Sequence, residues 1–421
     1  MTLPKIVKDG TTLISGNVWG QLVSFAAYIV LGRIYSPADF AVYNIFYSYI
    51  EVFVILSTCK YELSVVVADS DSEAAHTARL ALRLNTVVSL VLLSAIGIFR
   101  LLTPARPHSL TPATALLIPV MVFFCGTSRV YTFLFNRFKR FGPIAVSEVA
   151  ASTAGVVLKV AMAFSAALHS VGLPLGTVLG KLAGNANYLA RLRTLPNREA
   201  LRTSRRARLG HVARKYRNFP LYVMPKDLMN TFSHNLPFLW LALYFDKPEV
   251  GLFGLAVTFC FRPVNIFNNA FEKLLYVRVA ERVRTRRGIA ADLRRFVLAL
   301  NAVALPLFVG VFVFAEPLFT LVFGGRWAGI GYYVRCLVPW SYVVLTATSL
   351  SFLSNVFGRQ RSEFRFYVVL LVLRVGAVVC GIVRHDFRGA ILLFSLSGAL
   401  TSLALLVWYF LQVRRYENGL E

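Results

Sequence analysis

Apolar stretches of about 18–25 residues recur along the whole chain, and each is long enough to cross the ~30 Å hydrocarbon core of a bilayer as a helix. A chain in lipid must satisfy its backbone hydrogen bonds internally, and a helix does so within one segment. The composition agrees, because 57% of the residues are hydrophobic, only 15% are charged and the mean hydropathy is +0.62. We therefore predict an all-α polytopic membrane protein without a soluble domain.

The hydropathy pattern predicts about twelve transmembrane helices. They cover residues 12–33, 38–60, 81–102, 112–135, 144–167, 172–190, 219–245, 250–272, 294–316, 330–355, 364–384 and 388–411. The longest polar stretch, 191–217, is short and strongly basic, so we interpret it as a linker. The predicted organisation is a first bundle at 1–190, a basic cytoplasmic linker at 191–218 and a second bundle at 219–421.

Most of the 45 lysines and arginines fall in alternate loops of this scheme. Cytoplasmic loops carry such an excess, so both termini are predicted to be cytoplasmic. Loop topology also explains the net charge of +25 better than nucleic-acid binding does. The five cysteines lie in or beside apolar segments without metal-ligand spacing, which indicates packing residues.

Residues 31–43 and 241–253 resemble each other at a shift of 210 residues. In each, an aromatic residue ends one span, a proline-containing turn follows, and an acidic residue begins the next span. The shift is half the chain and covers an even number of spans. It predicts a parallel repeat of two six-helix bundles around a central cavity.

Six basic residues fall inside predicted spans: Arg129, Lys159, Lys181, Lys226, Arg262 and Arg374. A cation at the centre of a membrane helix costs at least ~2.5–3.5 kcal/mol, so repeated cations indicate a polar cavity for an anion. Arg262 is predicted near the midplane of its span and precedes Asn265, Asn268 and Asn269, and its guanidinium suits phosphate oxygens. The alternative for Arg262 is a structural ion pair with Glu51. The internal repeat places Glu51 one residue from the position that is equivalent to Arg262.

The remaining candidates for anion binding are Lys226, Lys159, Lys181, Arg129 and Asn17. Asn17 is equivalent to Asp227 in the repeat. Lys159 and Lys181 are predicted at similar depths in neighbouring spans, where a second phosphate contact and snorkelling to the interface are both open interpretations. The glycines between 176 and 184 favour close helix packing over a phosphate loop.

The seventh predicted span is the most polar and contains three prolines. Asp227 and His234 on this span, with Glu51, are candidates for coupling to H⁺ or Na⁺. Interhelical hydrogen bonding is the alternative role. Metal-ligand spacings, nucleotide-binding motifs and nucleophile–base arrangements are not evident, so no catalytic residue, metal or cofactor is predicted.

Several local motifs resemble those of Wzx-type oligosaccharide flippases. They are YELSVVV at 61–67 with the acidic residues 69–73, KYRNFPLY at 215–222, VGLFGLA at 250–256 and NVFGRQ at 355–360. This family belongs to the superfamily of multidrug and toxin extruders and lipid II flippases. The resemblance implies a bacterial inner-membrane protein that moves polyprenyl-pyrophosphate-linked oligosaccharide to the outer leaflet for O-antigen, capsule or exopolysaccharide synthesis. Its implied partners are that substrate and membrane lipid, with a polysaccharide polymerase and chain-length proteins as further candidates.

Three other functions compete with a flippase. A multidrug exporter of the same superfamily would carry small cations, which six buried basic residues disfavour. A membrane glycan polymerase or glycosyltransferase would be expected to carry a large outer loop or an acidic catalytic motif. A non-transporting scaffold would not need polar groups near the midplane.

Overall fold

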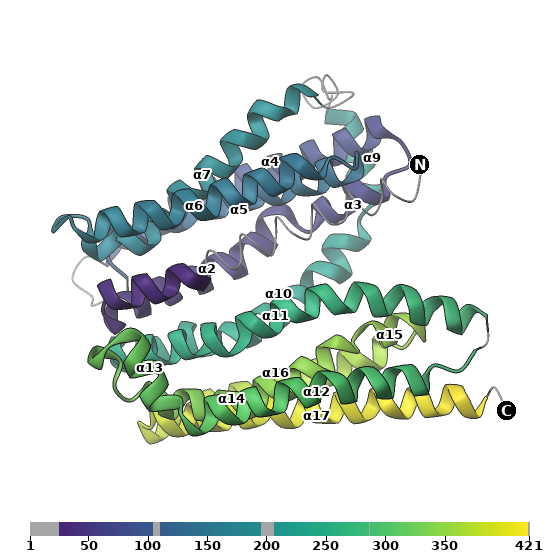
Figure 1. The fold of residues 1–421 in the computed structure, drawn as a ribbon. Coiled ribbons are helices and arrows are strands. Elements are labelled where there is room, and N and C mark those ends of the chain that lie inside the picture. Colours follow the sequence, from purple (N-terminus) through teal and green to yellow (C-terminus); the bar gives the residue numbers. More distant parts are fainter. Residues whose placement is uncertain (1–24, 104–109, 195–205, 286, 420–421) are drawn as a thin grey trace. The chain divides into compact units, whose positions relative to one another are not determined.

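The computed structural model describes residues 25–103, 110–194, 206–285 and 287–419. Its regular structure there comprises 15 α-helices between Pro37 and Asn418, a further helical segment at Phe25–Ile34, and short 3₁₀ and π turns (Figure 1). Contacts divide the chain into two compact units, Met1–Asn235 (unit 1) and Leu236–Glu421 (unit 2). The predicted all-helical fold class is confirmed for the described residues.

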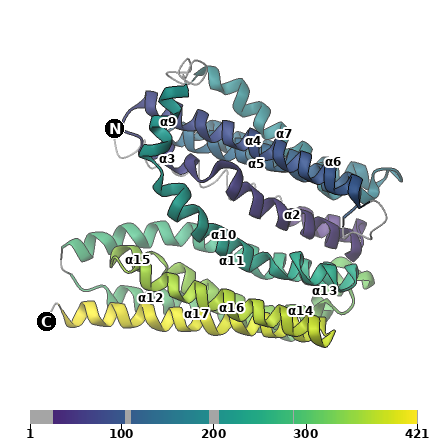
Figure 2. The ribbon, with the colours of Figure 1, turned by 180° about the vertical axis from the view of Figure 1, so that it is seen from behind.

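The helices of unit 1 follow the apolar stretches. They are α2 (Pro37–Thr58), α3 (Tyr61–Val67), α4 (Asp71–Leu102), α5 (Pro112–Arg137), α6 (Phe141–Ala163), α7 (Gly172–Arg191), α9 (Arg206–Lys215) and α10 (Met224–Leu239), whose last turn crosses into unit 2. Unit 2 contains α11 (Lys247–Arg284), α12 (Ala290–Val313), α13 (Ala315–Phe323), α14 (Ile330–Ser349), α15 (Phe352–Val356), α16 (Gln360–Arg384) and α17 (Phe387–Asn418). Figures 1 and 2 both show α16 running beside α17, in agreement with their extensive contacts.

Nine helical segments of the described chain are long and apolar enough to cross a membrane, and each coincides with a predicted span. Only 11% of the most apolar stretch of α4 and 6% of that of α12 is buried inside the protein. The outward surfaces of these helices are leucine- and valine-rich, which suits contact with lipid. The protein is therefore a multi-pass membrane protein.

The other three predicted spans differ from this pattern. The first is described only from Phe25, where Phe25–Ile34 forms a short apolar helix. The sixth is the 20-residue helix α7, which is less apolar than the nine. The seventh is broken into a π-helical turn at Phe219–Val223, α10 and a 3₁₀ turn at Leu241–Leu243.

Proline explains the break before α10. Pro225 lacks an N–H, so the α-helical hydrogen bond to the carbonyl of residue 221 cannot form. The N–H of Met224 donates instead to the carbonyl of Phe219, five residues earlier. A π turn of this kind widens the helix and is frequent at functional sites.

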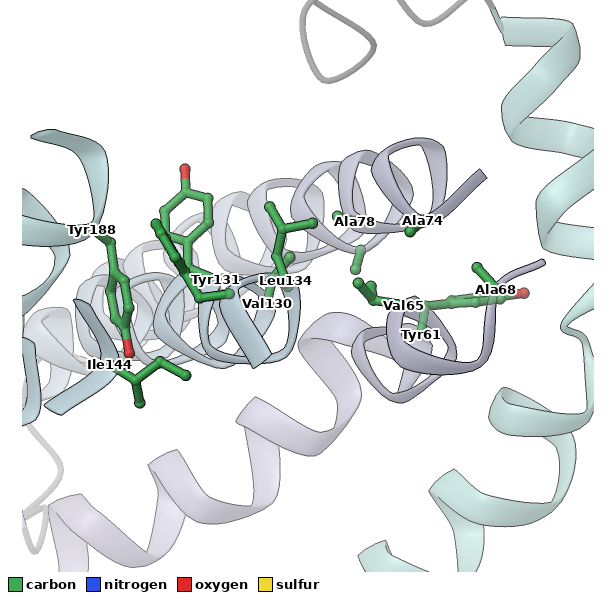
Figure 3. Packing of buried hydrophobic residues seen from close by; sticks show 12 residues of the cluster. Tyr61, Val65, Ala68, Ala74, Ala78, Val130, Tyr131, Leu134, Ile144 and Tyr188 are labelled. Atoms are coloured by element: carbon green, nitrogen blue, oxygen red, sulfur yellow. The ribbon is translucent and has the colours of Figure 1, made fainter. Parts of the chain in front are cut away.

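A hydrophobic cluster joins α3, α4, α5, α6 and α7 in unit 1 (Figure 3). Val65, Ala78, Val130 and Phe135 are each 0% exposed. Burial of this kind stabilises a side chain by ~1.5–3 kcal/mol for residues the size of valine or phenylalanine. The cluster fixes the rotation of α5 immediately after Arg129.

The most extensive helix pair is α6 with α7, and small residues allow it. Gly176, Gly180 and Gly184 repeat at four-residue intervals along one side of α7. A Cβ at Gly180 would lie 2.5 Å from the carbonyl oxygen of Ala151 and 2.7 Å from the Cα of Gly155. Such spacing lets two membrane helices approach backbone to backbone, so these glycines serve helix packing.

Replacing Gly180 by leucine is expected to force α6 and α7 apart. Overpacking of a well-packed site typically costs about 1–3 kcal/mol, so the thermal stability of the purified protein should fall. The measurement is the fraction that remains monodisperse in detergent after heating. The control is Gly97→Leu on α4, where an added Cβ meets nothing within 4 Å. Equal losses in the two variants would contradict the packing role of Gly180.

The described end of the predicted linker packs onto unit 1. The ammonium of Lys215 on α9 lies 2.7 Å from Asp69 Oδ2 and also pairs with Glu73. The hydroxyl of Tyr61 donates to the carbonyl of Ala213 at 3.1 Å. Figure 2 shows α9 against the ends of α3 and α4. The motifs 61–67, 69–73 and 215–222 thus meet in one junction.

Lys215→Met is expected to loosen α9. Its hydrogen bond lowers the pKa of Asp69 below the ordinary 3.8, and the two acids raise the pKa of Lys215 above 10.5. Ionised Asp69 stabilises the packing of α9, and this stabilisation is lost only as pH falls through the lowered pKa of Asp69. Charged Lys215 also stabilises the packing, and this stabilisation is lost only as pH rises through the raised pKa of Lys215. The junction should therefore persist at neutral pH, while Lys215→Met raises amide hydrogen exchange of α9 by up to about fivefold. The adjacent Arg214→Met is the control, and equal exchange in the two variants would contradict the junction.

Candidate functional site

A polar cavity of about 350 Å³ lies within unit 1, among helices of the membrane-spanning part. Two acids and two bases contribute to it: Glu51, Asp227, Lys60 and Arg129. Ile55, Asn230 and Thr231 complete the lining. We call this the unit 1 cavity. Four ionisable groups that line one cavity are costly to desolvate and therefore identify a candidate functional site.

Glu51 projects from α2 and is held by an amide. The Nδ2 of Asn235 donates to its Oε2 at 2.8 Å and also to the carbonyl of Thr231 at 2.9 Å. Arg129, on α5, is near enough to act electrostatically on the Glu51 carboxylate. Glu51 therefore connects a neutral donor on α10 with a cation on α5.

Lys60 lies at the junction of α2 and α3. Its Nζ is 2.7 Å from Oδ2 of Asp227, and the two side chains are 12% and 37% exposed, respectively. Cys59 and Lys60 both have left-handed backbone conformations, with φ of 50° and 60°. Two consecutive non-glycine residues in this region are unusual and require support from the surrounding fold.

Asparagines on two neighbouring helices fix α5 just before Arg129. Nδ2 of Asn85 on α4 donates to the carbonyl of Phe123 at 2.8 Å. Nδ2 of Asn185 on α7 donates to the carbonyl of Phe124 at 3.0 Å and to Ser128 Oγ at 2.9 Å. Both asparagines are buried, so these contacts determine the depth and rotation of α5 at the cavity.

The other predicted residues of unit 1 lie apart from the cavity lining. Lys159 Nζ stacks over the ring of Tyr43, 4.9 Å from its centroid. Lys181 pairs with Glu148 at 3.4 Å, so these two lysines have separate partners. Lys226 and His234 are exposed on α10. Asn17 lies outside the described residues.

The predicted arginine of unit 2 is on α11. Arg262 is half-buried and precedes Pro263 within the helix. Asn265 is exposed, whereas Asn268 is buried and its Oδ1 accepts from Ser349 Oγ at 2.8 Å. Asn268 therefore has a structural contact with α14.

Arg374 has a different environment from the other five cations. It is 0% exposed on α16, and its guanidinium carbon lies 4.7 Å from the ring of Trp340 and 4.6 Å from that of Phe394. The two rings pack edge to face at 5.8 Å. Stacking on aromatic faces stabilises a desolvated guanidinium by about 2 kcal/mol per good contact. Arg374 is thus part of the core of unit 2.

Sequence reasoning missed Lys60, Asn230 and Thr231 as cavity residues. Lys60 follows an apolar stretch and therefore looked like an ordinary loop cation. The ion pair joins residues 167 positions apart in sequence order, and no local pattern reports such a contact. The polar stretch on α10 was the available signal, and it led to Asp227 but not to its partner.

Comparison with known proteins identifies the family. Residues 30–331 match the family described as polysaccharide biosynthesis protein. The chain belongs to this family. A relative of similar sequence is the succinoglycan biosynthesis transport protein ExoT of Rhizobium meliloti (strain 1021). It is 22% identical over 386 residues, which cover 90% of this chain and 75% of ExoT. The resemblance seen in the sequence motifs is confirmed at the level of the family.

Solved structures share the fold of this polysaccharide biosynthesis protein. The lipid II flippase MurJ in an inward closed conformation aligns with a TM-score of 0.74 and 12% identity, covering 95% of this chain and 89% of MurJ. An inward-facing multidrug resistance MATE family transporter of the MOP superfamily aligns with a TM-score of 0.68 and 13% identity, covering 94% and 96%. The chain therefore has a fold similar to those of MurJ and of the MATE family transporter.

Proposed function

We propose that this protein is a flippase that moves polyprenyl-pyrophosphate-linked oligosaccharide across the bacterial inner membrane. The product would serve cell-surface polysaccharide synthesis, as O-antigen, capsule or exopolysaccharide. The observation that carries the proposal is a polar cavity lined by four ionisable side chains in unit 1 of a member of the polysaccharide biosynthesis protein family. ExoT, a named transport protein, supports transport rather than synthesis.

The proposed architecture is two six-helix bundles, twelve transmembrane helices in all, around a central cavity, with both termini in the cytoplasm. Transport would proceed by alternating access, with the lipid tail remaining in the bilayer. Such a protein needs no cofactor and no catalytic residue, and the inside-negative potential favours outward movement of an anion by ~2.3 kcal/mol per charge per 100 mV.

The proposed pyrophosphate contacts are Arg129 in unit 1 and Arg262 in unit 2, because guanidinium groups match phosphate oxygens in a bidentate geometry. Lys159, Lys181, Lys226, Asn265 and Asn17 remain candidates for contacts with the glycan or phosphate. Glu51, Asp227 and His234 remain candidates for H⁺ or Na⁺ coupling. Of these ten residues, Arg129, Glu51 and Asp227 line the unit 1 cavity.

Export of small cations is the second candidate function. The observation in its favour is the pair of carboxylates, Glu51 and Asp227, in the unit 1 cavity. Each carboxylate, however, has a donor or cation of the protein beside it, namely Asn235 or Lys60. The two carboxylates therefore do not give the cavity an excess of negative charge, and the family favours the flippase function over export of cations.

The test is the leaflet location of lipid-linked oligosaccharide in cells with and without the protein. Deletion should leave the oligosaccharide at the cytoplasmic face, and wild type should restore its outward movement. Arg262→Ala should be expressed normally but fail to restore it. An unchanged distribution on deletion would refute the flippase function, and drug export would then be tested.

A further inference from the structure

We propose that Lys60 and Asp227 form an exchangeable ion pair, in which a phosphate of the anionic substrate replaces the Asp227 carboxylate as the partner of Lys60. Lys60 would then be a substrate-binding residue, and the Asp227 carboxylate would be its counter-ion while no substrate is bound. This inference rests on the proposed function, because it assigns the phosphate-binding residues of that cavity.

Lys60 is the fixed member of the pair. Its side chain is only 12% exposed, and it extends from a left-handed turn between two helices. The core residues Tyr61 and Val65 anchor α3 directly after it. A lysine held in this way presents a point charge to the cavity, which is the usual role of lysine toward phosphate.

Asp227 is the member that can leave. Its side chain is 37% exposed, three times the fraction of Lys60, so water can solvate the carboxylate when the pair opens. It lies on the first turn of α10, directly after the π turn. Among the described residues, Lys60 is the partner that the structure gives to its carboxylate.

The charge balance of the unit 1 cavity favours exchange over simple addition. Lys60 and Arg129 are balanced by Asp227 and Glu51, so the cavity has no net charge to attract an anion. Glu51 is additionally held by Asn235 at 2.8 Å. Displacing Asp227 therefore frees the Lys60 ammonium by breaking one ion pair, whereas displacing Glu51 would also break its hydrogen bond with Asn235. Because the pair must open first, the apparent affinity for anions is the intrinsic affinity multiplied by the fraction of protein in which the pair is open.

This mechanism predicts effects of opposite sign for the two partners. The experiment is titration calorimetry of the purified full chain with inorganic pyrophosphate. Lys60→Met should weaken binding on the order of tenfold or more, since a charged hydrogen bond is lost. Asp227→Asn should strengthen binding by about tenfold, since the competing charge is removed. The control is Lys247→Met, an exposed lysine at the start of α11 and outside the cavity lining, which should leave binding unchanged.

A purely structural ion pair would behave differently, because both substitutions would then lower stability and neither would strengthen binding. Weaker or unchanged binding by a folded Asp227→Asn would overturn the proposal, as would unchanged binding by Lys60→Met or no binding by wild type. A second measurement needs no variant. Saturating pyrophosphate should increase carbodiimide labelling of Asp227 in the wild-type protein, and unchanged labelling would contradict exchange.

Failure of this inference is separable from failure of the proposed function. If pyrophosphate binds with the predicted pattern but deletion leaves the leaflet distribution of lipid-linked oligosaccharide unchanged, the exchange stands and the flippase function fails. If transport is confirmed but Asp227→Asn does not strengthen binding, the flippase function stands and the exchange fails.

Discussion

Replacing Arg129 by glutamine is expected to reduce transport of lipid-linked oligosaccharide by about tenfold to a hundredfold. Arg129 lines the unit 1 cavity, and loss of a charged hydrogen bond typically costs ~1.5–3 kcal/mol. Asn85 and Asn185 hold α5 through its backbone carbonyls just before Arg129. Because α5 is held there, we do not expect it to shift so that another cation takes the place of Arg129. The measurement is outward movement of the lipid-linked oligosaccharide at matched protein abundance.

The competing explanation is that Arg129 only neutralises Glu51. A charge left alone in a buried site can destabilise a protein by 3–5 kcal/mol, which would also reduce transport. The double variant Arg129→Gln with Glu51→Gln separates the two roles, because it removes both charges together. We expect it to fold normally and to transport as slowly as Arg129→Gln alone. Recovery of transport in the double variant would show that Arg129 acts on Glu51 and not on the substrate.

Trp340→Ala is expected to have the largest effect on stability. The indole contacts the guanidinium of Arg374 and packs against Phe394 and Phe261, with ring centroids 5.8 and 4.4 Å away. Truncation of a buried tryptophan costs about 3–5 kcal/mol, and the fully buried arginine also loses one of its two aromatic faces. The thermal unfolding midpoint in detergent, followed by circular dichroism, should fall steeply or the protein should fail to accumulate.

Trp340→Phe is the matched control for this prediction. It retains an aromatic face toward Arg374 and most of the buried volume, so it should lose less than half as much stability as Trp340→Ala. Leu321→Ala serves as a second control because Leu321 is 75% exposed and should be tolerated. Equal destabilisation by Trp340→Ala and Leu321→Ala would contradict the role assigned to this cluster.

Local features of the sequence predicted the helices well. The apolar stretches that became α4, α5, α12, α16 and α17 are long and weakly charged, so a single criterion identifies them. The glycines of α7 were likewise interpretable, because four-residue spacing of small residues places them on one side of a helix. The three prolines of the seventh span were the local signal that its helix is broken, but they do not indicate a π turn in particular.

The partners of the buried charges could not be predicted in the same way. Arg129, Lys181 and Arg374 look equivalent in the sequence, as basic residues in apolar stretches. In the structure Arg129 lines a cavity, Lys181 pairs with Glu148, and Arg374 contacts two aromatic rings. Those differences depend on contacts between helices distant in sequence. Lys60 was overlooked for the same reason, since its ion pair with Asp227 exists only once α10 packs beside α2.

The most direct test of the central claim is movement of lipid-linked oligosaccharide across vesicles that contain the purified protein alone. Substrate placed in one leaflet is followed by its accessibility to a glycan-modifying probe added outside. We predict that wild-type protein equilibrates the substrate between leaflets, and that Arg129→Gln does so about tenfold to a hundredfold more slowly. Equal movement in protein-free vesicles and in vesicles with wild-type protein would contradict the account.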